Sequence, residues 1–221
     1  MNNALFEYPK QAALYRVLPK NKIYDNASPS SALRQQFVAQ IDKIIWQYKL
    51  APETINLAAR NGVTEIQIFV VFLKVPELND AVLRCIDQAI PFPILFELIF
   101  EDKIKVIAAY KRISDLDANN SVVDVYFETK WLSVGEKRTA LPIALDLAGL
   151  YEQMLRRLIP LPPRAEESLK DQVERLSHIR NIQNECQRIA NSLAKEKQFN
   201  RKVELNAQLR NLKNELKALT S

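Results

Sequence analysis

The chain has very few glycines, cysteines and histidines, and each shortage excludes a class of site. Its three glycines are widely separated among 221 residues. Walker loops and dinucleotide fingerprints need several glycines close together and are therefore excluded. The single histidine, His178, cannot form a histidine metal site, and Cys85 and Cys186 lie too far apart in the sequence to complete one. We expect no zinc enzyme, two structural thiols and no resident metal or cofactor.

Long apolar runs are also missing. The longest, residues 91–100, is about half of what a membrane-spanning helix requires, and it includes Glu97. Residues 1–9 are polar and aromatic, so no charged-then-apolar leader opens the chain. We therefore expect a cytoplasmic protein with no membrane partner.

Positive charge is concentrated at the C-terminal end. The formal net charge is +5, and residues 164–221 hold 12 basic and 8 acidic side chains, which gives +4 for this part. Residues 1–163 hold 19 basic and 18 acidic side chains, which gives +1. The basic character therefore belongs to the tail, and the rest of the chain is close to neutral.

The last quarter of the chain, residues 164–219, contains neither proline nor glycine. Its apolar residues recur every three or four positions, which is typical of long amphipathic, coiled-coil-like helices. They form two stripes, the first comprising Leu169, Val173, Leu176, Ile179, Ile182, Cys186, Ile189 and Leu193, and the second comprising Leu205, Leu209, Leu212, Leu216 and Leu219. Between the stripes, residues 195–202 are polar except for Phe199.

Two structures fit this tail. One is a single helix with a stutter near Phe199, and the other is an antiparallel hairpin that turns at residues 198–200. Because no glycine or proline marks a turn, we favour the single helix. One helix cannot bury its own apolar stripe, so we expect residues 164–219 to bind a protein partner or a second copy of the chain.

Residues 1–163 form a body that ends in a stiff proline-rich linker. The pattern of this body predicts an α+β (mixed α/β) fold. We expect a mainly antiparallel sheet with flanking helices, because strand-like segments at 65–73, 94–100, 104–110 and 122–131 are interspersed with helical patterns at 76–90 and 142–158. A further helix is predicted after the turn cluster at residues 26–31, in which Ser28 or Ser30 can act as the cap. Its apolar stripe comprises Leu33, Phe37, Ile41, Ile44, Ile45 and Tyr48. Residues 18–24 are predicted to be a loop.

The strongest catalytic suggestion is the segment Glu128-Thr129-Lys130. Metal-dependent nucleases of the PD-(D/E)xK type place a carboxylate and a lysine two residues apart on an apolar strand, where the carboxylate holds Mg²⁺ and the lysine positions the attacking water. A further aspartate would complete the ion site, and the candidates are Asp102, Asp115, Asp117 and Asp124. The spacing is common by chance, however, and the Pro-Asp element is missing.

Glu97 is a lone carboxylate within an apolar strand. Burying it without a partner would be costly. We expect Lys105 or Lys111 of the neighbouring strand to pair with it. A structural ion pair is favoured over an active-site acid.

Two groups of residues are candidates for binding phosphate or nucleic acid. The first is a basic and aromatic group near the N-terminus, made of Arg16, Lys20, Lys22 and Tyr24. The second comprises Lys197, Arg201 and Lys202 in the tail. Acidic residues are interleaved with the tail cations, so an ordinary solvated helix face is the simpler interpretation of the second group.

The sequence resembles a family of bacterial proteins catalogued as domain of unknown function 4391. The likeness rests on the motifs Tyr8-Pro9, Leu18-Pro19-Lys20-Asn21-Lys22-Ile23-Tyr24, Ile90-Pro91-Phe92-Pro93-Ile94-Leu95-Phe96-Glu97-Leu98, Ala108-Ala109-Tyr110-Lys111-Arg112, Tyr126-Phe127-Glu128-Thr129 and Lys197-Gln198-Phe199-Asn200-Arg201-Lys202. The resemblance covers nearly the whole chain. It implies a setting beside helicases and DNA methyltransferases of restriction-modification or phage-defence systems, and it assigns no catalytic residue.

Three functions remain open from the sequence. The favoured one is a non-catalytic accessory protein of such a DNA-associated system, assembled through its C-terminal helix. The alternatives are a Mg²⁺-dependent nuclease that uses Glu128 and Lys130, and a nucleic-acid-binding module.

Overall fold

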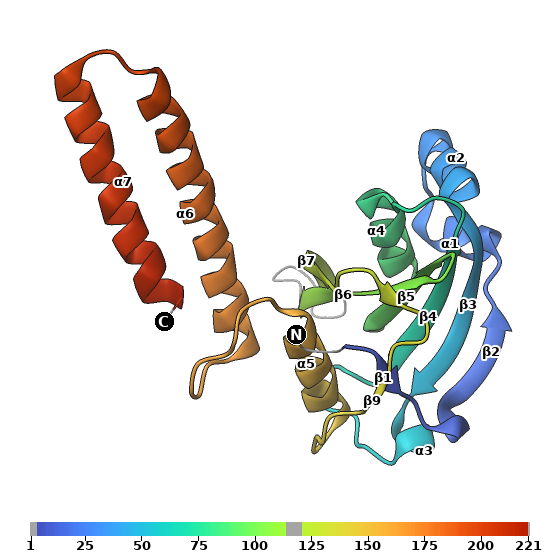
Figure 1. Cartoon of the computed structure of the whole chain (residues 1–221). Helices are drawn as coiled ribbons and strands as arrows, with labels where there is room; N and C mark the ends of the chain where they lie inside the picture. The colour runs from blue at the N-terminus through green and yellow to red at the C-terminus, as the bar shows by residue number, and fades with distance from the viewer. Residues whose placement is uncertain (1–3, 114–120, 221) are drawn as a thin grey trace. The chain divides into compact units, whose positions relative to one another are not determined.

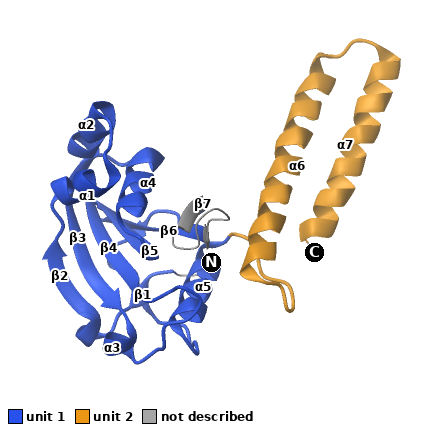
Figure 2. Cartoon of the chain, turned by 180° about the vertical axis from the view of Figure 1, so that it is seen from behind, with its two compact units in different colours: residues 1–159 blue, residues 160–221 orange. Residues whose placement is uncertain are grey.

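The computed structural model describes residues 4–113 and 121–220, with side chains for residues 4–111 and 125–220. The chain divides into two compact units, residues 1–159 and residues 160–221 (Figure 2). The first unit contains a mixed sheet with its helices, and the second contains two long helices (Figure 1).

The main sheet of the first unit follows the strand order β2-β3-β4-β5-β6-β7. These strands are β2 (Ala13–Val17), β3 (Ile41–Leu50), β4 (Ile66–Leu73), β5 (Ile94–Phe100), β6 (Lys103–Ile113) and β7 (Ser121–Glu128), and β8 (Leu132–Ser133) pairs with β6. Neighbouring strands are antiparallel except β4 and β5, which are parallel and joined by helix α4 (Asp80–Ala89). Strands β1 (Phe6–Glu7) and β9 (Thr139–Ala140) form a separate parallel pair. The predicted α+β class with a mainly antiparallel sheet is confirmed.

A hydrophobic core joins the sheet to the helices α1 (Lys20–Ala27), α2 (Ser31–Gln40) and α4. Phe69 of β4 and Phe96 of β5 are fully buried in it, together with Val82, Leu83 and Ile86 of α4. The remaining helices of this unit are the short η1 (Lys10–Ala12) and α3 (Pro52–Ile55), and α5 (Leu147–Leu158). The Tyr151 hydroxyl of α5 donates a hydrogen bond to the Ala109 carbonyl of β6, 2.7 Å away.

The predicted helix that carries the stripe from Leu33 to Tyr48 is wrong in its second half. The helix α2 ends at Gln40, and residues 41–50 form the strand β3, which pairs with β2 and β4. The pairing of β3 with β4 is interrupted by register shifts between Ile41 and Lys43 and between Trp46 and Tyr48. Such bulges break the simple alternation of a strand. The apolar residues are consequently spaced three and four apart, as they would be in a helix.

The predicted loop at residues 18–24 is also wrong, because Lys20–Ala27 is the helix α1. Two other helices begin later than their prolines suggested. Asn79 caps α4 by accepting a hydrogen bond from Ala81 N, and Asp146 caps α5 by accepting one from Gly149 N. Both caps satisfy backbone donors of the first helical turn, which fixes where the helix begins.

The second unit is an antiparallel hairpin of α6 (Leu169–Lys195) and α7 (Phe199–Thr220), so the preference for a single helix is wrong (Figure 1). Residues 196–198 connect the two helices. Glu196 leaves the helical conformation, and its carboxylate accepts hydrogen bonds from Lys197 N at 2.7 Å and from Gln198 N at 2.9 Å. An acidic side chain therefore stabilises this turn, which contains neither glycine nor proline.

Candidate functional site

The hairpin buries its two apolar stripes unequally. On α6 the buried apolar residues are Val173, Leu176, Ile179, Ile182 and Ile189. On α7 only Leu205 is buried, whereas Leu209, Leu212, Leu216 and Leu219 are half-buried. The helix α7 therefore keeps apolar surface in contact with solvent.

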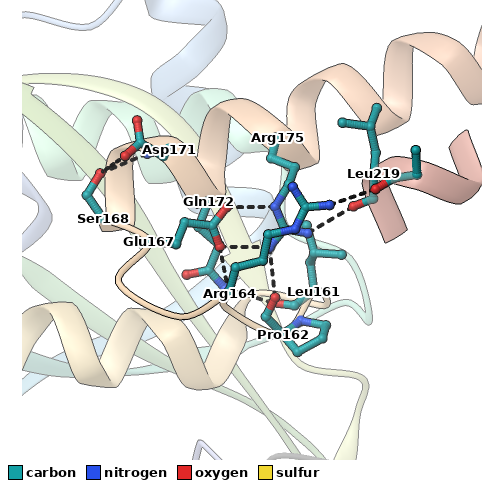
Figure 3. A network of polar contacts seen from close by, with 10 residues as sticks. Leu161, Pro162, Arg164, Glu167, Ser168, Asp171, Gln172, Arg175 and Leu219 are labelled. Carbon is teal, nitrogen blue, oxygen red and sulfur yellow. Dashed lines mark hydrogen bonds and ion pairs between the residues drawn. The ribbon is translucent and has the colours of Figure 1, made fainter. Parts of the chain in front are cut away.

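A polar clamp closes the base of the hairpin (Figure 3). Arg175 of α6 donates to both carboxylate oxygens of Glu167, with Nε–Oε1 at 2.6 Å and Nη2–Oε2 at 2.7 Å. It also donates to the Pro162 carbonyl at 2.8 Å and to the Leu219 carbonyl at 3.0 Å. The side chains of Arg175 and Glu167 are 7% and 8% exposed. One guanidinium thus connects the linker, the start of α6 and the end of α7.

Neighbouring contacts reinforce this clamp. Arg164 donates from its side chain to the Ala218 carbonyl at 2.7 Å, and its backbone N–H donates to Glu167 at 2.9 Å. Gln172 donates to the Leu161 carbonyl at 2.7 Å. The hydrogen bonds from Arg175 lower the pKa of the Glu167 carboxyl to about 2. Cationic donors at the last carbonyls of α7 also complement the partial negative charge of a helix C-terminus.

A shallow groove lies along one side of α7. The described residues that line it are two cations, two amides and three apolar residues, namely Arg210, Lys213, Asn206, Asn214, Val203, Ala207 and Leu209. None of these residues is acidic. Val203 is 53% exposed, and Phe199, one helical turn earlier, is 77% exposed. This groove therefore combines apolar side chains with two positive charges.

The candidate nuclease residues Glu128 and Lys130 do not form a shared site. Glu128 is the last residue of β7, is about half exposed, and lies 3.3 Å from Lys105 Nζ. Lys130 follows the strand and is exposed, so strand alternation does not place it beside Glu128. Asp102 is exposed in the β5–β6 turn. The side chain of Asp124, and the whole of Asp115 and Asp117, lie outside the described residues.

Glu97 is an ion-pair member, but its partner differs from the predicted one. Its side chain is 3% exposed and is held by Arg138 through two hydrogen bonds of 2.7 Å each. The strand register explains why Lys105 cannot serve, since Glu97 faces Val106 and Lys105 therefore points to the other side of the sheet. Arg138 also donates to the Phe6 carbonyl at 2.9 Å. The prediction of Lys105 or Lys111 as the partner is wrong.

Lys111 belongs to a second buried cluster that the sequence did not indicate. Its Nζ lies 2.9 Å from Asp87 Oδ1, and both side chains are at most 5% exposed. The Tyr126 hydroxyl donates to the other oxygen of Asp87, and the Arg84 guanidinium lies over the Tyr126 ring, 5.4 Å from its centroid. Lys111 also donates to the Phe92 carbonyl at 2.8 Å. These contacts join α4 to β6 and β7 and give the cluster a structural role.

A third cluster lies where β3 ends and β4 begins. Lys49 Nζ is 2.7 Å from Glu53 Oε1 and 3.3 Å from Glu65 Oε2. Gln67 is 4% exposed, and its amide donates to the other oxygen of Glu65. Sequence reasoning missed these residues because they are scattered over a strand end, the short helix α3 and the next strand.

The first group of predicted phosphate-binding residues is separated by the fold. Lys20 Nζ donates to the Ile41 carbonyl at 2.6 Å, and Tyr24 packs edge-on against Phe37 in the core. Arg16 lies on β2 opposite Trp46, and Lys22 is exposed on α1. No shared anion site is formed by these four described side chains.

The second group lies at the tip of the hairpin. Lys197 is exposed in the connection, and Lys202 is exposed on the first turn of α7. Arg201 pairs with Glu204 of the same helix at 2.7 Å. These cations are therefore available at the surface, but one of them is already paired.

The described residues contain neither a cluster suited to bind a metal ion nor a membrane-spanning helix. No group of three or more His, Cys, Asp or Glu side chains among them has the arrangement of a metal site. No helix in residues 4–113 or 121–220 has both the length and the apolar character to cross a membrane.

Comparison with known proteins agrees with the resemblance carried by the sequence motifs. No curated protein and no solved structure matches this chain. A family model does match, from residue 6 to residue 216, and so covers nearly the whole chain. The chain therefore belongs to the family described as domain of unknown function (DUF4391).

Proposed function

We propose that this protein is a cytoplasmic accessory component of a DNA restriction-modification or defence system, and that its C-terminal hairpin is the element through which it assembles. The observation that carries the proposal is the unequal burial of the hairpin. The apolar side chains of α7 are half-buried at best apart from Leu205, whereas five of the eight residues in the apolar stripe of α6 are buried. An amphipathic helix of this kind is stabilised when a partner covers the remaining apolar surface.

The charge around the groove on α7 defines the partner surface. Arg210 and Lys213 line the groove together with Val203 and Ala207, and no described lining residue is acidic. A partner helix with an apolar stripe and acidic flanks complements this groove. Electrostatic complementarity of this type favours the correct partner and speeds its association.

The test compares two neighbouring substitutions in the full-length protein. Ala207→Asp puts a charge into the groove, whereas Gln208→Asp puts the same charge on an exposed position of α7 outside it. Sedimentation of each purified variant shows whether the groove mediates self-association. Each variant is also purified from the native host. Detection of a co-purifying helicase or methyltransferase encoded beside this protein shows whether the groove binds a larger partner.

We expect Ala207→Asp alone to abolish the assembly. If the Ala207→Asp variant assembles as the wild type does, the groove has no role in assembly. If the wild-type chain sediments as a monomer and binds neither candidate partner, the assembly proposal fails.

A nucleic-acid-binding module is the second function that an observation favours. The same groove presents two cations and two amides, and Lys197 and Lys202 are exposed nearby in sequence. Binding of this kind predicts retention on DNA that weakens steeply with salt, because phosphate contacts release counterions. Retention that does not change with salt would exclude it. The hypothesis of a nuclease at Glu128 and Lys130 gains no support from the geometry of the described side chains.

A further inference from the structure

The cluster at the start of β4 brings together four polar side chains from three elements. Lys49 comes from the end of β3, Glu53 from α3, and Glu65 and Gln67 from the entry to β4. The antiparallel register places Lys49 directly opposite Gln67. Paired residues point to the same side of a sheet, so the lysine and the amide share one face. The Lys49 ammonium then reaches both carboxylates.

The backbone of α3, which carries Glu53, is held by local hydrogen bonds. The Thr54 hydroxyl donates to the Lys49 carbonyl at 2.7 Å and accepts from Ala51 N at 2.9 Å. These bonds hold the first turn of α3 against the end of β3. Glu65 is held from the other side by Gln67, which is almost completely buried. The two carboxylates meet at one ammonium, with Glu65 largely buried and also held by Gln67, and with the Glu53 side chain 61% exposed.

The order of these residues along the chain is an independent observation. The chain reads Pro52-Glu53, then residues 54–64, then Glu65-Ile66-Gln67 at the start of an apolar strand. A proline–acid pair followed by an acid and a polar residue two positions later is the order found in nucleases of the PD-(D/E)xK type. The segment at Glu128 lacks the proline–acid pair of this motif. Gln67 stands at the position of the usual lysine. Lys49 supplies the ammonium from the neighbouring strand, at the residue that pairs with Gln67.

From the geometry and the sequence order together, we propose that Glu53, Glu65 and Lys49 form a site for a divalent cation and a phosphodiester. Mg²⁺ is commonly held by one or two carboxylates, with water and substrate phosphate supplying its other oxygen ligands. Glu53 and Glu65 would supply the carboxylates. With a cation between them, Lys49 is released to contact a phosphate oxygen or the attacking water.

The reaction at this site is hydrolysis of the phosphodiester. The water oxygen forms a bond to phosphorus, and the bond from phosphorus to one sugar oxygen breaks. The leaving oxygen takes up a proton, and the proton lost by the water passes to solvent, so that a phosphate monoester and an alcohol are formed. The cation is not consumed, and no oxidant or reductant is required.

This inference concerns the first unit and does not depend on the assembly role proposed for the hairpin. Its first test is binding of Mn²⁺ to the full-length protein, followed by electron paramagnetic resonance. Glu65→Gln should weaken binding about tenfold or more, since it removes one ligand charge without changing side-chain size. Glu128→Gln is the matched control, because Glu128 is also paired with a lysine on the same sheet. It should bind Mn²⁺ as the wild type does.

Lys49→Met separates a cation site from an ion network that only stabilises the fold. Removing the ammonium takes away the group that competes with Mn²⁺ for the carboxylates, so binding should be retained or tightened. Cleavage of plasmid DNA in the presence of Mn²⁺ should nevertheless fall about 100-fold or more, because a positioned electrostatic group is lost. Thermal unfolding followed by circular dichroism identifies variants that fail to fold.

Each outcome decides one part of the proposal. If the wild type binds no Mn²⁺ at millimolar concentration, or if Glu65→Gln and Glu128→Gln bind equally well, the cation site is overturned. If Mn²⁺ binding depends on Glu65 but plasmid DNA is not cleaved, the cation site stands and the phosphodiester role is overturned. Neither result is affected by Ala207→Asp, so failure here is distinguishable from failure of the assembly proposal.

Discussion

Arg175 and Glu167 form a two-hydrogen-bond ion pair at the base of the hairpin, eight residues apart in the sequence. The same guanidinium reaches the Leu219 carbonyl at the far end of the second helix. The pair thereby ties the first turns of α6 to the last turn of α7 (Figure 3). Two helices joined by only a short connection at one end are in this way fastened at the other end as well.

Replacing Arg175 with methionine should therefore destabilise the hairpin. The change leaves the Glu167 carboxylate largely buried without its partner, and breaking such a pair typically costs about 3 kcal/mol. Urea unfolding of the full-length chain, with hydrogen exchange of the α6 and α7 amides, would measure the loss. The double variant Arg175→Met, Glu167→Met is the control and should recover part of the stability. Unchanged exchange rates in Arg175→Met would show that the clamp does not hold the hairpin closed.

Stability of the hairpin should depend on pH in the acid range. The pKa of Glu167 is lowered to about 2 in the folded protein, compared with about 4.3 for an unperturbed glutamate. A depressed carboxyl pKa contributes stability that is complete above about pH 5 and is lost as the pH falls toward 2. Helical circular dichroism during urea unfolding between pH 6 and about 2 would measure it. The Glu167→Gln variant should lack this part of the pH dependence. If the wild type and this variant show the same profile of stability against pH, the dependence does not come from Glu167.

The buried ion pair between Glu97 and Arg138 should make a large contribution to the stability of the first unit. Glu97 is 3% exposed, so Arg138→Met leaves a buried charge without compensation and should cost about 3–5 kcal/mol. Removing both charges with Glu97→Leu and Arg138→Met should cost much less, because no isolated charge remains. The midpoint of urea unfolding measures both effects. Equal losses in the single and double variants would contradict this account.

Local patterns in the sequence predicted the α+β class because most strands and helices of the body have simple periodicity. They failed at β3, where two irregularities in the pairing with β4 give the apolar residues a helical spacing. They also failed at the turn of the hairpin. There the stabilising group is the Glu196 carboxylate, which accepts two backbone hydrogen bonds, and no residue typical of turns is present.

The polar clusters were harder to predict because their members are distant in sequence. Arg138 is 41 residues beyond Glu97, and only the fold brings them together. Lys49 and Glu65 meet because β3 pairs antiparallel with β4, which the mistaken helix at residues 41–48 concealed. The sequence contains a proline–acid pair, Pro52-Glu53, followed by Glu65-Ile66-Gln67, but no lysine stands two residues after Glu65. The structure places Lys49 of the adjacent strand beside both carboxylates.

The hydrogen bond from Tyr126 to Asp87 gives a last test of how the body is held together. Burial and the nearby Asp87 charge raise the pKa of the Tyr126 hydroxyl, so that it stays protonated and donates. Tyr126→Phe removes the donor and leaves one oxygen of a fully buried carboxylate without it, which should cost about 1–3 kcal/mol in urea unfolding. Tyr15→Phe is the matched control, since Tyr15 is 65% exposed, and it should cost almost nothing. Equal effects of the two substitutions would show that Asp87 draws its stabilisation from Lys111 alone.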